Sequence, residues 1–268
     1  MTAREKLQSK FDKNYHICVG LDTDINKIPK HLLKEIDPVL EFNKIIIEST
    51  FEQAACYKIN FAFYEKYGAK GFDALAQTLE LIPKEIFTIA DAKRGDIGNT
   101  SEMYAAAVFD ELKFDSITLH PYMGLDSLQP FLSYKEKINF ILALTSNKGA
   151  VDFEKQKLKD GKFLFQLVIE KANIWNEHKN CGIVFGATNI NELKENIASF
   201  NDLIVLLPGV GAQGGSLEET VTTFNQNSNK NFLINISRSL LYCDESMSFH
   251  SKVTEQLKNY NNSVFNSV

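Results

Sequence analysis

Three charged residues follow an apolar, strand-like run in this chain. Residues 86–90 read as a buried strand, and Asp91, Lys93 and Asp96 come directly after them. Because alternate side chains of a strand share a face, Asp91 and Lys93 are expected to point the same way. Gly95 breaks the strand and leaves Asp96 in a turn, from which it can swing back or reach a neighbouring chain. An ammonium fixed beside carboxylates can stabilise developing negative charge and deliver a proton, whereas the alternative is an incidental ion pair at a solvated strand end.

A lysine in the preceding strand needs a partner of opposite charge. Lys58 stands among Cys56, Ile59 and Phe61 in an apolar run, and a buried unpaired ion is strongly disfavoured. If Lys58 faces inward, Asp91 on the next strand is the obvious partner. Other polar residues also collect where the expected strands end, and the whole set is Asp22, Lys58, Asp91, Lys93, Asp96, Ser146, Gln213 and Arg238.

Two loops late in the chain have the composition of a phosphate site. Residues 208–215 read Pro-Gly-Val-Gly-Ala-Gln-Gly-Gly, and the backbone amides of Gly211, Gly214 and Gly215 could approach an anion closely. The run 237–239 offers Arg238, whose guanidinium could hold the same phosphate. A glycine-rich turn alone would be only a tight turn, but the arginine after the next strand favours a phosphate site.

Composition narrows the class of protein. The 268 residues are 44% hydrophobic, which suits a sizeable core, and the net charge of -5 argues against non-specific nucleic-acid binding. Residues 1–7 contain no apolar signal core and no run reaches membrane-spanning length, so we expect a cytoplasmic protein without a membrane partner. The four cysteines and five histidines have no metal-ligand spacing, and no transition-metal site is predicted.

Strand-like and helical segments alternate along the chain, which predicts an α/β protein with a parallel sheet covered on both faces. Eight such units in this length fit a single (β/α)8 TIM barrel over residues 1–268, preceded by a short N-terminal helix. A doubly wound open sheet is the alternative, but no GxGxxG follows the first strand. The charged loop 147–162 is long enough to act as a lid. The expected strands are 17–22, 55–61, 86–90, 116–120, 138–145, 182–186, 203–207 and 232–236, and the expected helices are 3–13, 38–55, 64–81, 100–112, 124–134, 163–178, 191–200, 216–224 and 249–260, with a frayed tail after residue 260.

Taken together, these motifs resemble those of the orotidine 5′-phosphate decarboxylase family. The resemblance rests on Asp91-x-Lys93-x-x-Asp96-Ile97, on Lys58 in the preceding strand and on the loop 208–215. It spans residues 22–238 and is closest to the longer-chain subgroup. Ser237 stands where many members have glycine before the arginine.

The resemblance implies the decarboxylation of orotidine 5′-phosphate to UMP and CO2, the last step of de novo UMP biosynthesis, without a metal or organic cofactor. Lys93 would face the carbanion left at pyrimidine C6 and protonate it. Asp91 would lie near the substrate carboxylate, and Lys58 and Asp96 would complete an array of alternating charges around Lys93.

The resemblance also implies substrate contacts and a partner. Asp22 and Thr100 would meet ribose hydroxyls, Ser146 the pyrimidine amide edge, and Gln213 and Arg238 the phosphate. A homodimer is implied as well, in which Asp96, Ile97 and Thr100 reach into the partner's site. Two other functions are weighed against this one: a metal-dependent sugar-phosphate decarboxylase or aldolase on the same barrel, and a catalytically silent barrel that binds a phosphate ligand.

Overall fold

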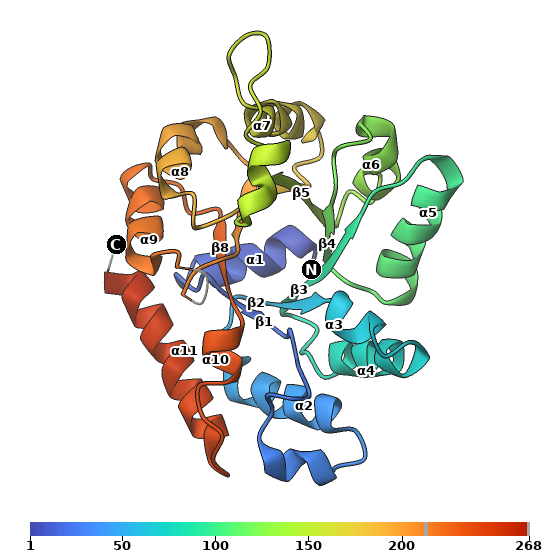
Figure 1. Ribbon diagram of the computed structural model, residues 1–268, viewed down its shortest axis with the longest axis vertical. Helices are drawn as coiled ribbons and strands as arrows, with labels where there is room; N and C mark the ends of the chain where they lie inside the picture. The colour runs from blue at the N-terminus through green and yellow to red at the C-terminus, as the bar shows by residue number, and fades with distance from the viewer. Residues whose placement is uncertain (212–213, 267–268) are drawn as a thin grey trace.

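Eight parallel strands close into a barrel in the computed structural model, which describes residues 1–211 and 214–266 (Figure 1). Each strand pairs with its neighbours in chain order, and β1 pairs with both β2 and β8. This closure confirms the predicted (β/α)8 barrel and excludes the doubly wound open sheet. The strands are β1 (Ile17–Gly20), β2 (Cys56–Asn60), β3 (Phe87–Arg94), β4 (Ser116–Leu119), β5 (Ile138–Leu144), β6 (Cys181–Phe185), β7 (Ile204–Leu207) and β8 (Phe232–Ile236).

Helices form the outer layer, and they cover the strands where the apolar periodicity predicts them (Figure 1). The α-helices are α1 (Ala3–Phe11), α2 (Pro38–Thr50), α3 (Ala62–Glu65), α4 (Ala69–Glu80), α5 (Gly98–Ala106), α6 (Leu125–Leu132), α7 (Leu164–Trp175), α8 (Ile190–Asn196), α9 (Leu217–Gln226), α10 (Arg238–Leu241) and α11 (Phe249–Asn266). The short helices are η1 (Lys30–Lys34), η2 (Ala107–Glu111, a π-helix that ends α5), η3 (Lys148–Asp152) and η4 (Ile197–Ser199). The predicted helix 64–81 is divided in two around Gly68, where the sequence shows an interruption.

The barrel interior is apolar at its base and polar at its top. Inward-facing residues alternate along each strand, so that β3 presents Phe87, Ile89 and then Asp91 to the interior. In β2, Lys58 stands two positions after the buried Cys56 on the same face. The polar end is therefore the carboxyl end of the strands, where barrels of this kind carry their functional sites.

Helix α1 closes the opposite end of the barrel. Its Ala3, Leu7 and Phe11 pack into the interior cluster, and Figure 1 shows the helix crossing behind the strands. The ammonium of Lys6 donates to both carboxylate oxygens of Asp115, at 2.8 and 2.9 Å. Burial of three side chains and this ion pair keep solvent out of the base of the barrel.

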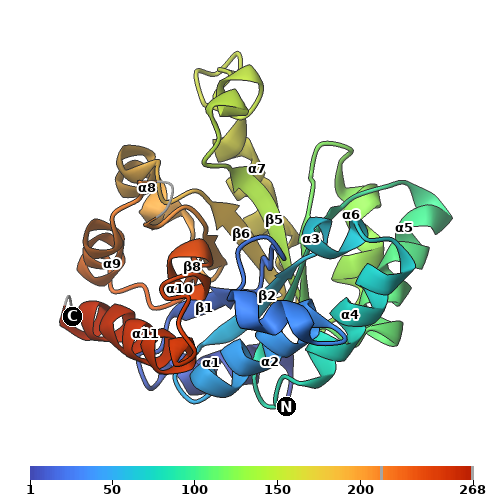
Figure 2. The same ribbon diagram turned by 60° about the horizontal axis from the view of Figure 1, so that its bottom comes forward.

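The third strand and the charged loop are more regular than the sequence predicts. The predicted strand 86–90 continues to Arg94, since Asp91 and Lys93 belong to β3 itself. The loop 147–162 contains η3 and an isolated bridge between Lys157 and Phe163, and it stands out from the barrel beside α7 (Figure 2).

The prediction of a frayed tail after residue 260 is wrong. Helix α11 continues to Asn266, because Asn261 and Val264 extend the buried face that begins with Val253 and Leu257. The amide of Asn261 donates to the Gln53 carbonyl at 3.1 Å, which ties this last part of the helix to the barrel. The asparagines that favour a tail in the sequence lie along one ordered helix.

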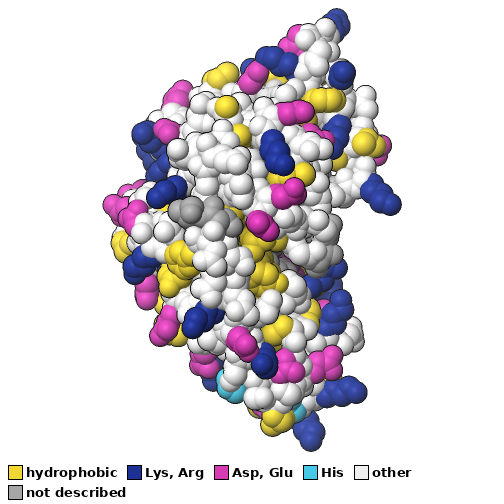
Figure 3. All heavy atoms as spheres, turned by 90° about the vertical axis from the view of Figure 1, so that its left-hand side faces the viewer, with side chains coloured by type: hydrophobic (Ala, Val, Ile, Leu, Met, Phe, Trp, Pro, Cys, Tyr) yellow, Lys and Arg dark blue, Asp and Glu magenta, His cyan; other side chains and the backbone are white. Residues whose placement is uncertain are grey.

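Charged side chains of both signs are interspersed over the face formed by α8, α9 and α11, which Figure 3 shows. Among the described residues, none of the helices combines the length and hydropathy needed to cross a bilayer.

A buried histidine near the base makes the stability of the fold depend on pH. His16 lies between the rings of Phe11 and Phe232, with ring centroids at 5.0 and 4.0 Å, and Nδ1 lies 3.0 Å from the Phe232 carbonyl oxygen. Nδ1 therefore carries the proton of the neutral ring. Burial lowers the pKa of His16 from 6.5 to about 4.

We expect the free energy of unfolding to fall as the pH is lowered from about 6.5 to about 4. The unfolded chain takes up a proton on His16 near its ordinary pKa, whereas the folded chain takes it up only near 4. This difference corresponds to a loss of about 3 kcal/mol at the acid end. Urea unfolding at several pH values should show a shallower dependence for His16→Gln, which keeps a donor and does not titrate. An equal dependence in the two proteins would contradict this prediction.

Candidate active site

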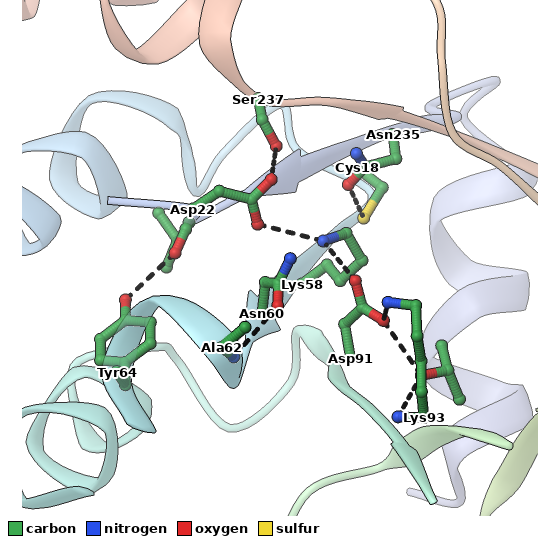
Figure 4. A network of polar contacts seen from close by, with 12 residues as sticks. Cys18, Asp22, Lys58, Asn60, Ala62, Tyr64, Asp91, Lys93, Asn235 and Ser237 are labelled. Carbon is green, nitrogen blue, oxygen red and sulfur yellow. Dashed lines mark hydrogen bonds and ion pairs between the residues drawn. The ribbon is translucent and has the colours of Figure 1, made fainter. Parts of the chain in front are cut away.

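Four side chains of alternating charge form a continuous chain at the top of the barrel (Figure 4). Lys58 Nζ lies 3.2 Å from Asp22 Oδ1 and 3.1 Å from Asp91 Oδ2. Lys93 Nζ lies 2.5 Å from Asp91 Oδ1. The pairing of Lys58 with Asp91 follows from the register of β2 and β3, in which Asn60 is opposite Asp91 and Lys58 is two positions earlier.

The charges of these four side chains keep Lys58 and Asp91 ionised. Burial alone would lower the pKa of Lys58, but the carboxylates of Asp22 and Asp91 raise it well above its ordinary value. Burial alone would raise the pKa of Asp91, but Lys58 and Lys93 lower it well below its usual range. Both groups are therefore ionised throughout the neutral pH range.

These four charged side chains line a cavity of about 300 Å³, large enough for a small ligand. Its walls come from the ends of most strands of the barrel. They are formed by Asp22, Lys58, Asn60, Asp91, Lys93, Thr118, Leu142, Thr145, Ser146, Asn147, Val184, Leu206, Pro208 and Asn235.

The two lysines differ in access to this cavity. The Lys58 side chain is 4% exposed and lies beneath two carboxylates, whereas the Lys93 side chain is 45% exposed. Lys93 is thus the ammonium that a bound molecule can reach. Lys58 lies deeper and neutralises the carboxylates of Asp22 and Asp91.

Residues of the segment after β8 hold Asp22 in place. Ser237 Oγ donates to Asp22 Oδ2 at 2.7 Å, and the Tyr242 hydroxyl donates to the Asp22 carbonyl at 3.2 Å. Gly20 makes the first contact possible, since a Cβ at that position would lie 2.0 Å from Ser237 Oγ. Ser237, which stands where the commoner pattern has glycine, therefore binds the Asp22 carboxylate.

The glycine-rich loop after β7 is folded on itself. The amides of Gly211, Gly214 and Gly215 donate to carbonyls of Gly215, Gly211 and Gly209, at 3.1, 2.9 and 3.0 Å. In this conformation these three amides are engaged within the loop, and their contact with a phosphate stays a prediction. Positive φ values of 73° at Gly211 and 92° at Gly214 explain why glycine is needed there.

Two other residues are expected at the phosphate. Gln213 lies outside the described residues. Arg238 is exposed at the start of α10, directly after Ser237, on the side of the barrel where the loop after β7 also lies. A Cβ on Gly211 would lie 3.5 Å from Ser239 Oγ, so the two loops are neighbours.

Asp96, Ile97 and Thr100 are among the predicted site residues that do not line this cavity of their own chain. Asp96 accepts a hydrogen bond from the Ile97 amide at 2.8 Å, and Ile97 is 57% exposed. Thr100 is exposed on the first turn of α5. Of the three charged residues that follow the predicted strand 86–90, the structure thus brings Asp91 and Lys93 together and leaves Asp96 partly exposed after the end of β3.

Two buried polar residues of the cavity escaped the sequence analysis. Thr118 and Asn235 lie inside β4 and β8, where each is surrounded in sequence by apolar residues. A polar residue at an inward position near the carboxyl end of a strand is the signal that could have identified both.

A closed parallel barrel with a charged cavity at the carboxyl ends of its strands defines an enzyme of the (β/α)8 class. Residues 15–245 match the family model described as orotidine 5′-phosphate decarboxylase / HUMPS family. The chain belongs to this family.

Known proteins agree with this assignment. A protein of Christiangramia forsetii named orotidine 5′-phosphate decarboxylase is 49% identical over 93% of this chain and 92% of its own length. The solved OMP decarboxylase of Leishmania donovani is 35% identical, with a TM-score of 0.82, over 98% of this chain and 100% of that one. The UMP synthase of the same organism has a TM-score of 0.85 at 36% identity, and this chain spans 57% of its length. The comparisons confirm the predicted decarboxylase of the carboxy-lyase class and do not favour the metal-dependent alternative.

Proposed function

We propose that this chain decarboxylates orotidine 5′-phosphate to UMP and CO2 without a metal or organic cofactor, with Lys93, Asp91, Lys58 and Asp96 as its catalytic residues. The observation that supports this most strongly is the chain of alternating charges that ends in the accessible ammonium of Lys93. That arrangement offers a fixed positive charge and a transferable proton at one point of the cavity.

The chemistry follows from these charges. The bond between pyrimidine C6 and the carboxylate breaks, CO2 leaves, and the electron pair stays on C6, where no adjacent carbonyl can accept it. Lys93 Nζ stabilises this negative charge and then gives its proton to C6, which yields UMP. Asp91 lies 2.5 Å from Lys93 Nζ and is kept ionised by Lys58, so it holds the ammonium in place and faces the substrate carboxylate with like charge.

The rest of the substrate is assigned to the surrounding strand ends. We assign the ribose hydroxyls to Asp22 and to Thr100 of the partner, and the pyrimidine amide edge to Ser146, which lines the cavity. Gln213 and Arg238 are assigned to the phosphate, whose binding energy can be used at the remote reacting carbon.

Replacement of Arg238 by alanine should weaken transition-state binding by about 2–3 kcal/mol, the scale of a lost charge-assisted contact. The measurement is kcat/KM for orotidine 5′-phosphate and for a truncated substrate without the phosphate. The truncated substrate should react equally slowly with the variant and the original protein. Arg4→Ala is the matched control, since Arg4 is on α1 at the base of the barrel. If the variant also slows the truncated substrate, Arg238 does not act on the phosphate.

The overall reaction is tested by the loss of orotidine 5′-phosphate absorbance with purified protein, with and without EDTA. Equal rates with and without the chelator are expected. Turnover abolished by EDTA would support a metal-dependent reaction, and binding without turnover would support the silent barrel.

We further propose a homodimer in which Asp96, Ile97 and Thr100 act in the partner's site. Exposed apolar side chains that follow β3, β4 and β5 support this: Ile97, Met103, Tyr122 and Phe153 are 57%, 64%, 83% and 62% exposed. The rings of Tyr122 and Phe153 are 6.2 Å apart, and both line a largely apolar pocket of about 690 Å³ between the end of β4 and α7. Apolar surface of this kind on a protein marks an interaction site.

Two coarser expectations complete the proposal. Residues 1–268 are proposed to form one barrel domain, because α1 at the base and α11 at the side both pack into its core. We also propose that the protein acts in the cytoplasm.

A further inference from the structure

The two reactive residues of β3 lie in a bulge of that strand. In the pairing of β3 with β4, Ala90 is opposite Ile117 and Arg94 is opposite Leu119. Asp91, Ala92 and Lys93 are therefore all opposite the single residue Thr118. Such a bulge bends the strand and changes the direction of its side chains.

The bulge contains an unusual backbone conformation. Lys93 has a φ of 48°, in the left-handed region that residues other than glycine adopt rarely. Residues held in this region persist where surrounding contacts fix them, and they concentrate at functional sites. The question is which contact fixes Lys93.

The Thr118 hydroxyl makes that contact. It accepts a hydrogen bond from the Lys93 amide at 3.0 Å and donates one to Asp91 Oδ1 at 3.0 Å. Thr118 is 2% exposed, so water does not replace either bond easily. The Thr118 hydroxyl oxygen thus connects the Lys93 backbone to the Asp91 carboxylate, and Asp91 Oδ1 in turn binds Lys93 Nζ.

We infer that Thr118 is a positioning residue for the decarboxylation, which sets Lys93 and Asp91 at the distance and angle that the reaction requires. This inference rests on the catalytic roles proposed above for those two residues. Thr118 acts by closing the bulge: its hydroxyl keeps the Lys93 backbone left-handed, and it holds the Asp91 oxygen that the ammonium needs. Without the hydroxyl, the Lys93 amide loses its partner and the bulge is free to relax.

Thr118→Val tests this role because valine keeps the shape of threonine and removes only the hydroxyl. We expect kcat to fall about 10²-fold, the effect of misplacing a reacting group by about 1 Å, with KM and UMP affinity changed less than about threefold. Thr118→Ser keeps the hydroxyl and should restore kcat to within about threefold of the original value. A rise in KM at unchanged kcat, or a serine variant as slow as the valine variant, would overturn the inference.

Thr88 provides a matched control at the other end of the barrel. Its buried hydroxyl makes the same pair of bonds, accepting from the Asp115 amide and donating to Asp115 Oδ2, both at 3.1 Å. Thr88→Val should lower the melting temperature and leave kcat unchanged. If it lowers kcat as much as Thr118→Val does, the effect at Thr118 is one of general stability and the inference fails.

Two further comparisons make the result decisive. If Thr118→Val does not fold, Thr118→Ser is compared with Thr118→Ala, since these two differ only in the hydroxyl. Equal kcat values for serine and alanine would overturn the inference. Lys93→Ala is assayed beside them: turnover in that variant contradicts the proposed catalytic roles, whereas an inactive Lys93→Ala with a normal Thr118→Val contradicts the Thr118 inference alone.

Discussion

Replacement of Lys93 by alanine is expected to lower kcat more than about 10⁴-fold, because one side chain supplies both the charge that faces the carbanion and the proton that quenches it. Lys58 cannot substitute, since its side chain is 4% exposed and its ammonium is bound to Asp22 and Asp91. Asp91 would lose one of its two cations but keep Lys58 at 3.1 Å. The variant should therefore fold, and the rate loss should be chemical in origin.

The measurement is single-turnover decarboxylation together with calorimetric titration of UMP. UMP should still bind to Lys93→Ala, because the residues assigned to the phosphate are separate from Lys93. Lys252→Ala is a suitable control, as Lys252 is exposed on α11 in an ion pair with Glu255. Turnover close to normal in a folded Lys93→Ala protein would rule out the mechanism.

The sequence predicts the barrel well because the strands are short apolar runs separated by amphipathic helices, a local pattern. It fails where contacts between distant segments decide the structure. The helical tail after residue 260 is stabilised by contacts such as that of Asn261 with the Gln53 carbonyl, which is far away in the chain. The continuation of β3 through Asp91 and Lys93 depends on the pairing of Asp91 with Asn60 of β2 and of Arg94 with Leu119 of β4, while the charges themselves suggest the end of a strand.

In the candidate site, too, local sequence predicts some contacts, whereas others depend on segments that are far apart in the chain. The pairing of Lys58 with Asp91 could be predicted, because neighbouring strands and a buried charge leave few choices. The contact of Ser237 with Asp22 could not, since it depends on the closure of the barrel between β1 and β8 and on the missing Cβ of Gly20. The expected approach of Asp91 to Lys93 is observed, but it arises from a bulge and a left-handed lysine, which regular strand geometry does not contain.

The position of Asp96 leads to the second large effect. Asp96 lies two residues after the end of β3, accepts a hydrogen bond from the neighbouring Ile97 amide, and does not line the cavity of its own chain as that cavity is described. Ile97 and Thr100 are exposed next to it. If these residues complete the partner's site, the lesions of Lys93→Ala and Asp96→Asn fall in the same site of a mixed dimer and leave the other site intact.

Each variant alone is expected to be almost inactive, and activity should return when their subunits are exchanged. A mixed dimer has one site with both lesions and one site with neither. With random exchange about half of the dimers are mixed and half of their sites are intact, so about a quarter of the original activity should reappear, by the two-fold symmetry of the interface. Exchange is followed separately with subunits that carry different tags. A mixture of Lys93→Ala with Asp91→Asn is the control: each site of that mixed dimer carries one lesion, so no intact site forms and no activity should return. Confirmed exchange without any return of activity would mean that Asp96 serves the site of its own chain.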